Sequence, residues 1–263
     1  MFAAPLTLPL RERVALKARG GVRPRSWGFA PPHHELLRSS TLPLKGRVAR
    51  GASLLALLLG CIVPVPARAE PLRVLAFGDS LTAGFMLPAD AAFPAQLERR
   101  LRADGFDATV VNAGVSGETT AAGLARADFA LGEGADLVIL ELGANDMLRG
   151  VDPKVTSANL DKIVTEIEAR KVAILLAGMV ASGNFGPDYK ARFDAVFPDL
   201  AARRGLPLYP FFLSGVAGDK ALVLPDGLHP NADGAARIAS GIAPLVEQSL
   251  ARLKNARERQ APH

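Results

Sequence analysis

A serine, a histidine and an aspartate are the residues of this sequence whose types and spacing best suit covalent chemistry. Ser80 lies in the stretch Gly-Asp-Ser-Leu at 78–81, directly after an apolar run. A serine hydroxyl is a poor nucleophile until a neighbouring base takes its proton. His229 is the only histidine that lies neither in the N-terminal segment nor at the last position of the chain. If Ser80 is a nucleophile, His229 is therefore its base.

A carboxylate lies close to this histidine in the sequence. Asp226 precedes His229 by three residues, with Gly227 between them. Such a carboxylate can curl under the imidazole ring and hold its tautomer, as the third member of a catalytic triad does. Two plainer interpretations stay open, because a serine after a strand often caps a helix and Asp, His and Asn beside proline are ordinary helix-entry residues. The presence of all three residues favours the triad.

Acyl transfer also needs hydrogen-bond donors for the oxyanion that forms on the attacked carbonyl. Gly114 follows a second apolar run and could bring a bare backbone N–H close to a substrate. Asn145 follows a third apolar run and offers a neutral side-chain amide. Either residue alone is typical of a turn. We interpret three further polar residues as local hydrogen-bonding residues rather than catalysts: Asp79, Ser116 and Asp146.

Short apolar runs alternate with amphipathic stretches from residue 70 onward, which is the pattern of βα units in a parallel sheet. The predicted strands are 73–77, 109–111, 137–142, 172–179 and 208–212. The predicted helices are 91–103, 119–131, 153–169, 189–204 and 232–250. The sequence therefore predicts an α/β protein, a three-layer α/β/α sandwich with a five-stranded parallel sheet. Its ligand should bind beyond the carboxyl ends of the strands.

Four sequence blocks, in the same order, resemble those of the SGNH (GDSL) hydrolases. They are the stretch at 78–81, Gly114, the stretch Gly-Ala-Asn-Asp at 143–146, and the stretch Asp-Gly-Leu-His at 226–229. The resemblance covers residues 73–250. It implies a flavodoxin-like sheet and a serine hydrolase that works through an acyl-enzyme intermediate, with no metal or organic cofactor.

The resemblance also implies a role for each matching residue. Ser80 would be the nucleophile, His229 the base and Asp226 the acid that orients it. The backbone N–H of Ser80, Gly114 and Asn145 would form the oxyanion hole.

Three segments, 141–150, 184–186 and 226–231, are similar to the bacterial periplasmic thioesterase I/lysophospholipase L1 and arylesterase group. This likeness implies hydrolysis of small-molecule acyl esters and thioesters. Apolar residues in loops at the strand ends could line an acyl-binding groove, or could belong to the core. These candidate substrate-binding residues are Met86, Leu87, Met147, Leu148, Val180 and Phe185.

Two other functions are alternatives to an acyl esterase. A carbohydrate O-acetylesterase of the same fold would need a polar sugar-binding cleft in place of apolar loops. A non-catalytic binding module would have no need of a triad. The sequence therefore favours the acyl esterase.

The N-terminal segment has the form of an export signal. Residues 45–69 contain a basic stretch, an apolar run and a small-residue cleavage site, which is the pattern of a signal peptide. Cleavage after Ala69 predicts a periplasmic or secreted enzyme, whereas a lipid-modified Cys61 would make it an anchored lipoprotein. Residues 1–44 lack apolar periodicity and are expected to be disordered or to precede the true start codon. Residues 70–263 are expected to form the hydrolase domain.

The positive charge of the chain is concentrated in this leader. Residues 1–69 hold 11 of the 31 Lys and Arg residues but only 2 of the 26 Asp and Glu residues, so the rest of the chain is net acidic. Nucleic-acid binding rests on clustered basic residues, and we expect none. The apolar run of the leader is also too short for a stable membrane span. The domain is expected to be a monomer.

Overall fold

A five-stranded parallel sheet forms the centre of the fold in the computed structural model, which describes residues 70–260. The strands lie in the order β2-β1-β3-β4-β5, and each pairs in parallel with its neighbours. Almost all residues of β1, β3 and β4 are buried, as expected for parallel strands covered on both faces. The strands are β1 (Leu72–Gly78), β2 (Ala108–Gly114), β3 (Leu137–Glu141), β4 (Ala173–Ala177) and β5 (Leu208–Tyr209).

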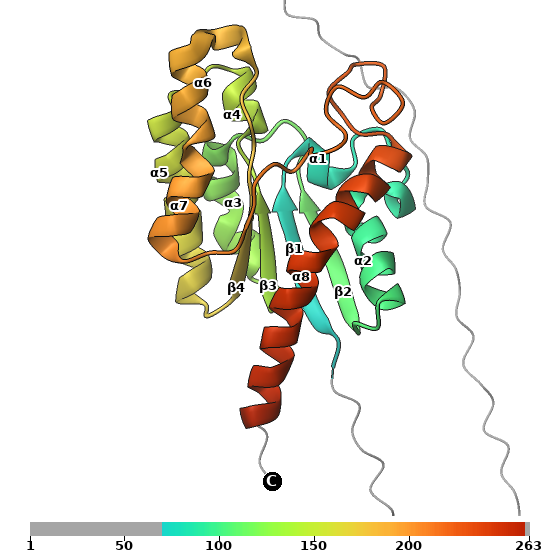
Figure 1. The fold of residues 1–263 in the computed structure, drawn as a ribbon. Coiled ribbons are helices and arrows are strands. Elements are labelled where there is room, and N and C mark those ends of the chain that lie inside the picture. The colour runs from blue at the N-terminus through green and yellow to red at the C-terminus, as the bar shows by residue number, and fades with distance from the viewer. Residues whose placement is uncertain (1–69, 261–263) are drawn as a thin grey trace, which may run out of the picture. The chain divides into compact units, whose positions relative to one another are not determined.

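Helices cover both faces of this sheet (Figure 1). α2 (Phe93–Ala103) packs against α8 (Ala232–Gln260) on one face, whereas α3 (Thr120–Leu131), α5 (Pro153–Ala169) and α7 (Val196–Arg204) lie on the other. This arrangement confirms the predicted three-layer sandwich. The shorter elements are α1 (Ser80–Ala83), η1 (Ala89–Ala91), α4 (Ala144–Leu148), η2 (Gly183–Phe185) and α6 (Gly186–Asp194).

Apolar side chains fill the space on each side of the sheet. Leu97 of α2 and Ile242 of α8 are fully buried on one side, and Leu160 and Ile163 of α5 are fully buried on the other. Full burial of such a side chain contributes about 1.5–3 kcal/mol. The sheet is therefore a rigid platform for the loops that follow its strands.

Most predicted elements differ from the observed ones by a few residues at their ends, as β2 does (Ala108–Gly114 against the predicted 109–111), and three further differences are informative. The helix predicted for 189–204 is two helices, α6 and α7, because Pro198 has no N–H to donate to the carbonyl four residues earlier. The strand predicted for 208–212 is reduced to β5, which Pro210 follows directly. The helix expected to end at residue 250 continues to Gln260.

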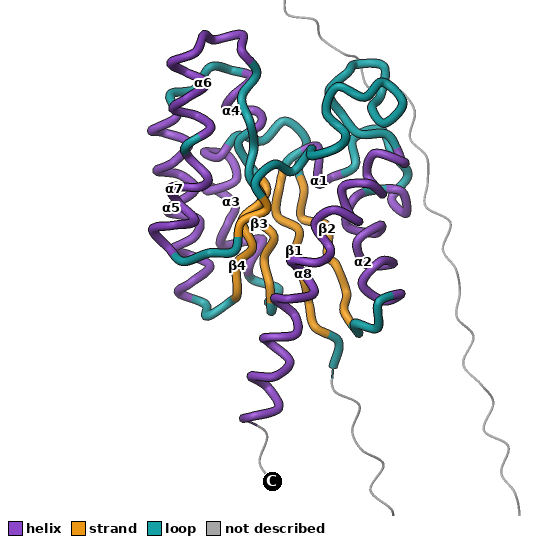
Figure 2. The backbone as a smooth tube through the Cα atoms, viewed as in Figure 1, coloured by secondary structure: helices purple, strands orange, loops and turns teal. Residues whose placement is uncertain are grey.

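The carboxyl ends of β1, β2 and β3 are level with one another. Gly78, the last residue of β1, pairs with Gly114 of β2 and with Glu141 of β3. The chain places β2 on one side of β1 and then crosses over to β3 on the other, and ligands of open α/β sheets bind where the strand order reverses in this way. Figure 2 shows the loop before α8 at the same end of the sheet as α1 and α4.

The predicted leader lies outside the described residues. What the sequence predicts for residues 1–44, for the signal segment 45–69 and for Cys61 therefore stays a prediction. Within residues 70–260, no helix is both long and apolar enough to cross a membrane.

Candidate active site

Ser80 occupies the junction between β1 and α1. It is the first residue of α1, and the preceding Asp79 caps this helix by accepting a hydrogen bond from the Leu81 N–H at 3.0 Å. Gly84 ends the helix after one turn in the left-handed conformation, with φ of 78°. Within the described part of the chain, no hydrogen bond uses the backbone N–H of Ser80. This N–H is thus available at the positive end of a helix, where a developing negative charge is favoured.

The structure brings the three predicted triad residues together. The Nε2 atom of His229 lies 2.9 Å from the Ser80 Oγ, and its Nδ1 lies 2.6 Å from Asp226 Oδ2. An ionised carboxylate can only accept hydrogen bonds, so Nδ1 carries the proton and Nε2 is left to accept the serine proton. This is the chain of contacts that general-base activation of a serine requires.

The loop at 226–229 is folded by its own aspartate. Asp226 Oδ1 accepts hydrogen bonds from the backbone N–H groups of Leu228 at 2.9 Å and His229 at 3.0 Å. Gly227, which directly follows Asp226, has φ of 71°. These backbone bonds, together with the bond to the His229 ring, lower the pKa of Asp226 to about 2. Asp226 is therefore ionised throughout the pH range in which a histidine base works. The ring of Phe85 lies 4.4 Å from the imidazole ring and covers part of it.

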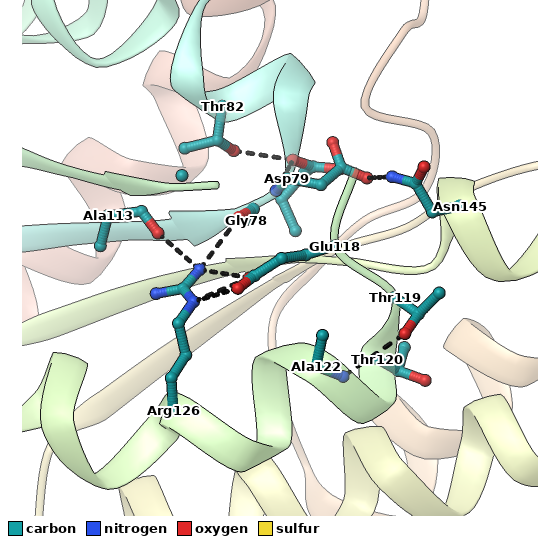
Figure 3. A network of polar contacts seen from close by, with 12 residues as sticks. Gly78, Asp79, Thr82, Ala113, Glu118, Thr119, Thr120, Ala122, Arg126 and Asn145 are labelled. Carbon is teal, nitrogen blue, oxygen red and sulfur yellow. Dashed lines mark hydrogen bonds and ion pairs between the residues drawn. The ribbon is translucent and has the colours of Figure 1, made fainter. Parts of the chain in front are cut away.

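Asn145 lies in α4, directly beyond the end of β3. Gly143 turns the chain into this helix with φ of 123°. One hydrogen of the Asn145 amide is donated to Asp79 Oδ2 at 3.0 Å (Figure 3), which leaves the second hydrogen free. Asn145 borders the same cleft as Ser80 and His229. Its side chain is thus held in one orientation beside the nucleophile.

The structure does not bring Gly114, the predicted second oxyanion donor, to the cleft. Its N–H is donated to Asn112 Oδ1 at 3.0 Å, and it does not border the cleft. Gly117, three residues further along, does border the cleft, and no hydrogen bond within residues 70–260 uses its N–H. The sequence could not separate the two glycines, because the direction of each N–H depends on how the loop after β2 turns.

Two buried carboxyl groups lie beneath the nucleophile. Burial is the main cause that raises the pKa of Asp79 to about 6. Burial, and then the charge of Asp79, raises the pKa of Glu141 well above its usual range. Glu141 Oε2 accepts a hydrogen bond from Thr82 Oγ1 at 2.7 Å and one from the Asp79 N–H at 3.4 Å. Sequence reasoning missed Glu141, since it read as the polar end of a strand.

The other polar residues near the site have local roles. Asp146 is buried and accepts hydrogen bonds from the N–H and hydroxyl of Thr120 and from the hydroxyl of Thr156. Ser116 borders the cleft. Among residues 70–260, no group of three or more His, Cys, Asp and Glu side chains is placed to hold a metal ion.

A largely apolar cleft of about 620 Å³ opens over the triad. Of the six predicted substrate-binding residues, Met147, Leu148 and Val180 line it. Met86, Leu87 and Phe185 do not: the Met86 side chain is 79% exposed, and the Phe185 ring packs beside Tyr189. Sequence reasoning missed other apolar lining residues: Leu81, Phe85, Met179, Phe211, Leu213 and Leu228. Phe85 and Leu228 could have been found, because they are close in sequence to Ser80 and His229.

Comparison with known proteins identifies the family of this chain. A sequence model described as the GDSL-like lipase/acylhydrolase family matches residues 76–237. Esterase TesA of Pseudomonas aeruginosa is 36% identical over 197 residues, which is 74% of this chain and 98% of the relative. An arylesterase of Vibrio mimicus is 37% identical over 194 residues, 73% of this chain and 96% of the relative.

Solved structures show the same likeness. A crystal structure of AlinE4, an esterase of the SGNH-hydrolase family, is 44% identical with a TM-score of 0.59, over 69% of this chain and 98% of that one. A crystal structure of TesA is 36% identical with a TM-score of 0.64, over 67% of this chain and 99% of that one. The matched segment contains Ser80, Asn145, Asp226 and His229. The chain therefore belongs to the GDSL-like lipase/acylhydrolase family and is a serine ester hydrolase.

Proposed function

We propose that Ser80, His229 and Asp226 hydrolyse esters and thioesters of apolar acyl groups through an acyl-enzyme intermediate. In the first step the Ser80 Oγ bonds to the substrate carbonyl carbon while His229 Nε2 takes the hydroxyl proton. The ionised Asp226 stabilises the positive charge that the imidazole then carries. His229 returns this proton to the leaving oxygen or sulfur atom as the bond to the acyl carbon breaks.

Water completes the reaction. His229 takes a proton from the water molecule, whose oxygen attacks the acyl-serine carbonyl, and returns it to Ser80 Oγ as the acid is released. In both steps the carbonyl oxygen becomes an oxyanion. We assign its stabilisation to three donors, the N–H groups of Ser80 and Gly117 and the free amide hydrogen of Asn145.

The apolar cleft supports an acyl substrate. Ser80 and His229 form part of its polar lining, while Met147, Val180 and Leu213 are among its apolar walls. An apolar acyl chain buried there gains about 0.8 kcal/mol for each CH₂ group removed from water. A carbohydrate O-acetylesterase would need hydroxyl-binding side chains in place of these walls. A binding module would not need the hydrogen-bonded chain from Asp226 to Ser80.

The test compares acyl groups and leaving groups on the purified protein. Turnover should rise from p-nitrophenyl acetate to p-nitrophenyl esters of longer chains, and an acyl-CoA should be hydrolysed as well. Ser80→Ala is the matched inactive control. Preferred cleavage of an acetylated saccharide would favour the O-acetylesterase, and absence of turnover on every ester would favour the binding module.

A further inference from the structure

One guanidinium group binds two backbone carbonyls and one carboxylate close to the nucleophile (Figure 3). Arg126 extends from α3 toward the carboxyl ends of β1 and β2. Its Nη2 donates hydrogen bonds to the carbonyl oxygens of Gly78 at 3.2 Å and Ala113 at 2.8 Å. Its Nε donates to both carboxylate oxygens of Glu118, at 2.7 and 2.8 Å. Neither Arg126 nor Glu118 is part of the triad or borders the cleft.

The surroundings of Arg126 hold it in one geometry. Its guanidinium carbon lies 4.3 Å from the centre of the Phe77 ring. The side chains of Arg126 and Glu118 are only 21% and 11% exposed. A planar guanidinium that is stacked on a ring and shared between a carboxylate and two carbonyls cannot be replaced by the point charge of a lysine. The pair is thus a fixed brace rather than a loose surface ion pair.

The atoms that Arg126 holds enclose the loop that carries Gly117. β2 ends at Gly114, and the loop that follows it runs to Glu118. Ala113, just before this loop, and Glu118, at its end, both bind Arg126. The Gly78 carbonyl lies two residues before Ser80 and also accepts the N–H of Val115 at 3.0 Å. One side chain therefore fixes the nucleophile and the glycine loop relative to each other.

We propose that Arg126, together with Glu118, is a positioning residue that holds the Gly117 N–H against the oxyanion formed at Ser80. The inference rests on the proposed function, since it gives Gly117 a part in that reaction. Donors for an oxyanion are effective only when they are already in place, and a misplacement of about 1 Å can cost a factor of about 10² in rate. Loss of the brace therefore lowers kcat, while binding of the acyl chain in the cleft, and with it KM, changes little.

Arg204 supplies the matched control. It forms a comparable two-bond pair with Asp161, at 3.0 and 2.9 Å, on α7 and α5, and its side chain is 27% exposed. Arg126→Met should lower kcat about 10- to 100-fold with KM within about threefold. Arg126→Lys should lower kcat too, and Glu118→Gln less so. Arg204→Met should keep kcat within about twofold, even if urea unfolding shows that both methionine variants lose similar stability.

A second measurement separates positioning from general damage. A fluorophosphonate bonds to the Ser80 Oγ and places a phosphoryl oxygen at the oxyanion position, so its labelling rate should fall in parallel with kcat in the Arg126 variants. If Arg126→Met does not fold, Arg126→Lys and Glu118→Gln decide the question. Folded Arg126→Lys and Glu118→Gln variants with unchanged kcat and labelling rate would overturn the positioning role alone. Absence of Ser80-dependent turnover in the unsubstituted protein would overturn the proposed function and this inference together.

Discussion

In the proposed mechanism Ser80 and Asn145 contact the same reacting carbonyl but should contribute differently to the rate, because one forms a bond and the other only stabilises charge. Loss of a serine nucleophile costs a factor of roughly 10⁶, and loss of one oxyanion donor costs about 10² to 10³. Asn145→Ala should therefore keep measurable activity with a lowered kcat, and Ser80→Ala should have almost none. Steady-state kinetics on a p-nitrophenyl ester checks this. An Asn145→Ala variant with unchanged kcat and a raised KM would contradict the assigned role.

Asp79 should make the fold less stable as the pH rises. Its pKa is raised from 3.8 to about 6 by burial, so between these values the folded protein binds more protons than the unfolded chain. The contribution of Asp79 to the free energy of unfolding then falls as the pH rises through this window and does not change above it. Asp79→Asn cannot titrate. Urea unfolding gives the free energy of unfolding of the variant and of the parent at pH 4 and pH 7. From pH 4 to pH 7, the variant should gain up to about 3 kcal/mol in this free energy relative to the parent. A difference that does not vary with pH would contradict the raised pKa.

The sequence singles out the three residues that the structure joins by hydrogen bonds, but not Gly117, which borders the cleft. Ser80 and His229 are identifiable because few residue types can act as nucleophile and base, and only one histidine was available. Gly117 and Glu141 are not identifiable in the same way. The role of Gly117 depends on the direction of a backbone N–H, and that of Glu141 depends on complete burial beneath another carboxyl group.

We expect the backbone conformation of the loop at 226–229 to matter for catalysis. Gly227 and Gly205 both have positive φ, 71° and 65°, and neither has an atom within 4 Å of where a Cβ would stand. An alanine at either position should therefore cost about 1–2 kcal/mol, through left-handed strain alone. Only Gly227→Ala should also lower kcat, because it shifts Asp226 relative to His229.

The measurement pairs urea unfolding with kinetics for the two glycine variants. Equal losses of stability with a kcat loss in Gly227→Ala alone would support this view of the loop. Equal kcat in both variants would show that the Asp226–His229 pair tolerates a different backbone.

The elements themselves follow closely from the sequence where apolar pattern decides them. Each predicted strand exists, and so does each predicted long helix except the one at 189–204, which is divided into α6 and α7. Burial of Val, Ile and Leu on both faces of the sheet leaves few alternatives. The errors of extent occur where proline or packing overrides the pattern. Pro198 interrupts one helix, and Leu253 packs against the core in the part of α8 that was not expected.

Export of the whole molecule is a prediction of the leader alone. The leader contains a basic stretch, then an apolar run, then small residues before Glu70. This order is the pattern of a secretory signal peptide. Mass spectrometry of the exported protein should find Glu70 at the amino terminus. A diacylated Cys61 at that terminus would replace this prediction with the lipoprotein alternative.

The catalytic hydrogen bond between Ser80 and His229 joins residues that are 149 positions apart. Ser80 directly follows the first strand, whereas His229 precedes the last helix. The nucleophile therefore has no base until nearly the whole domain has been synthesised and has docked α8 against α2. A partly synthesised chain is consequently harmless to the esters around it. Because of the same separation, covalent labelling of Ser80 can be used to follow folding of the domain over time. During refolding, the rate at which the serine becomes reactive should equal the rate at which α8 docks. Docking of α8 should be one of the slowest steps, because it closes a loop of this length.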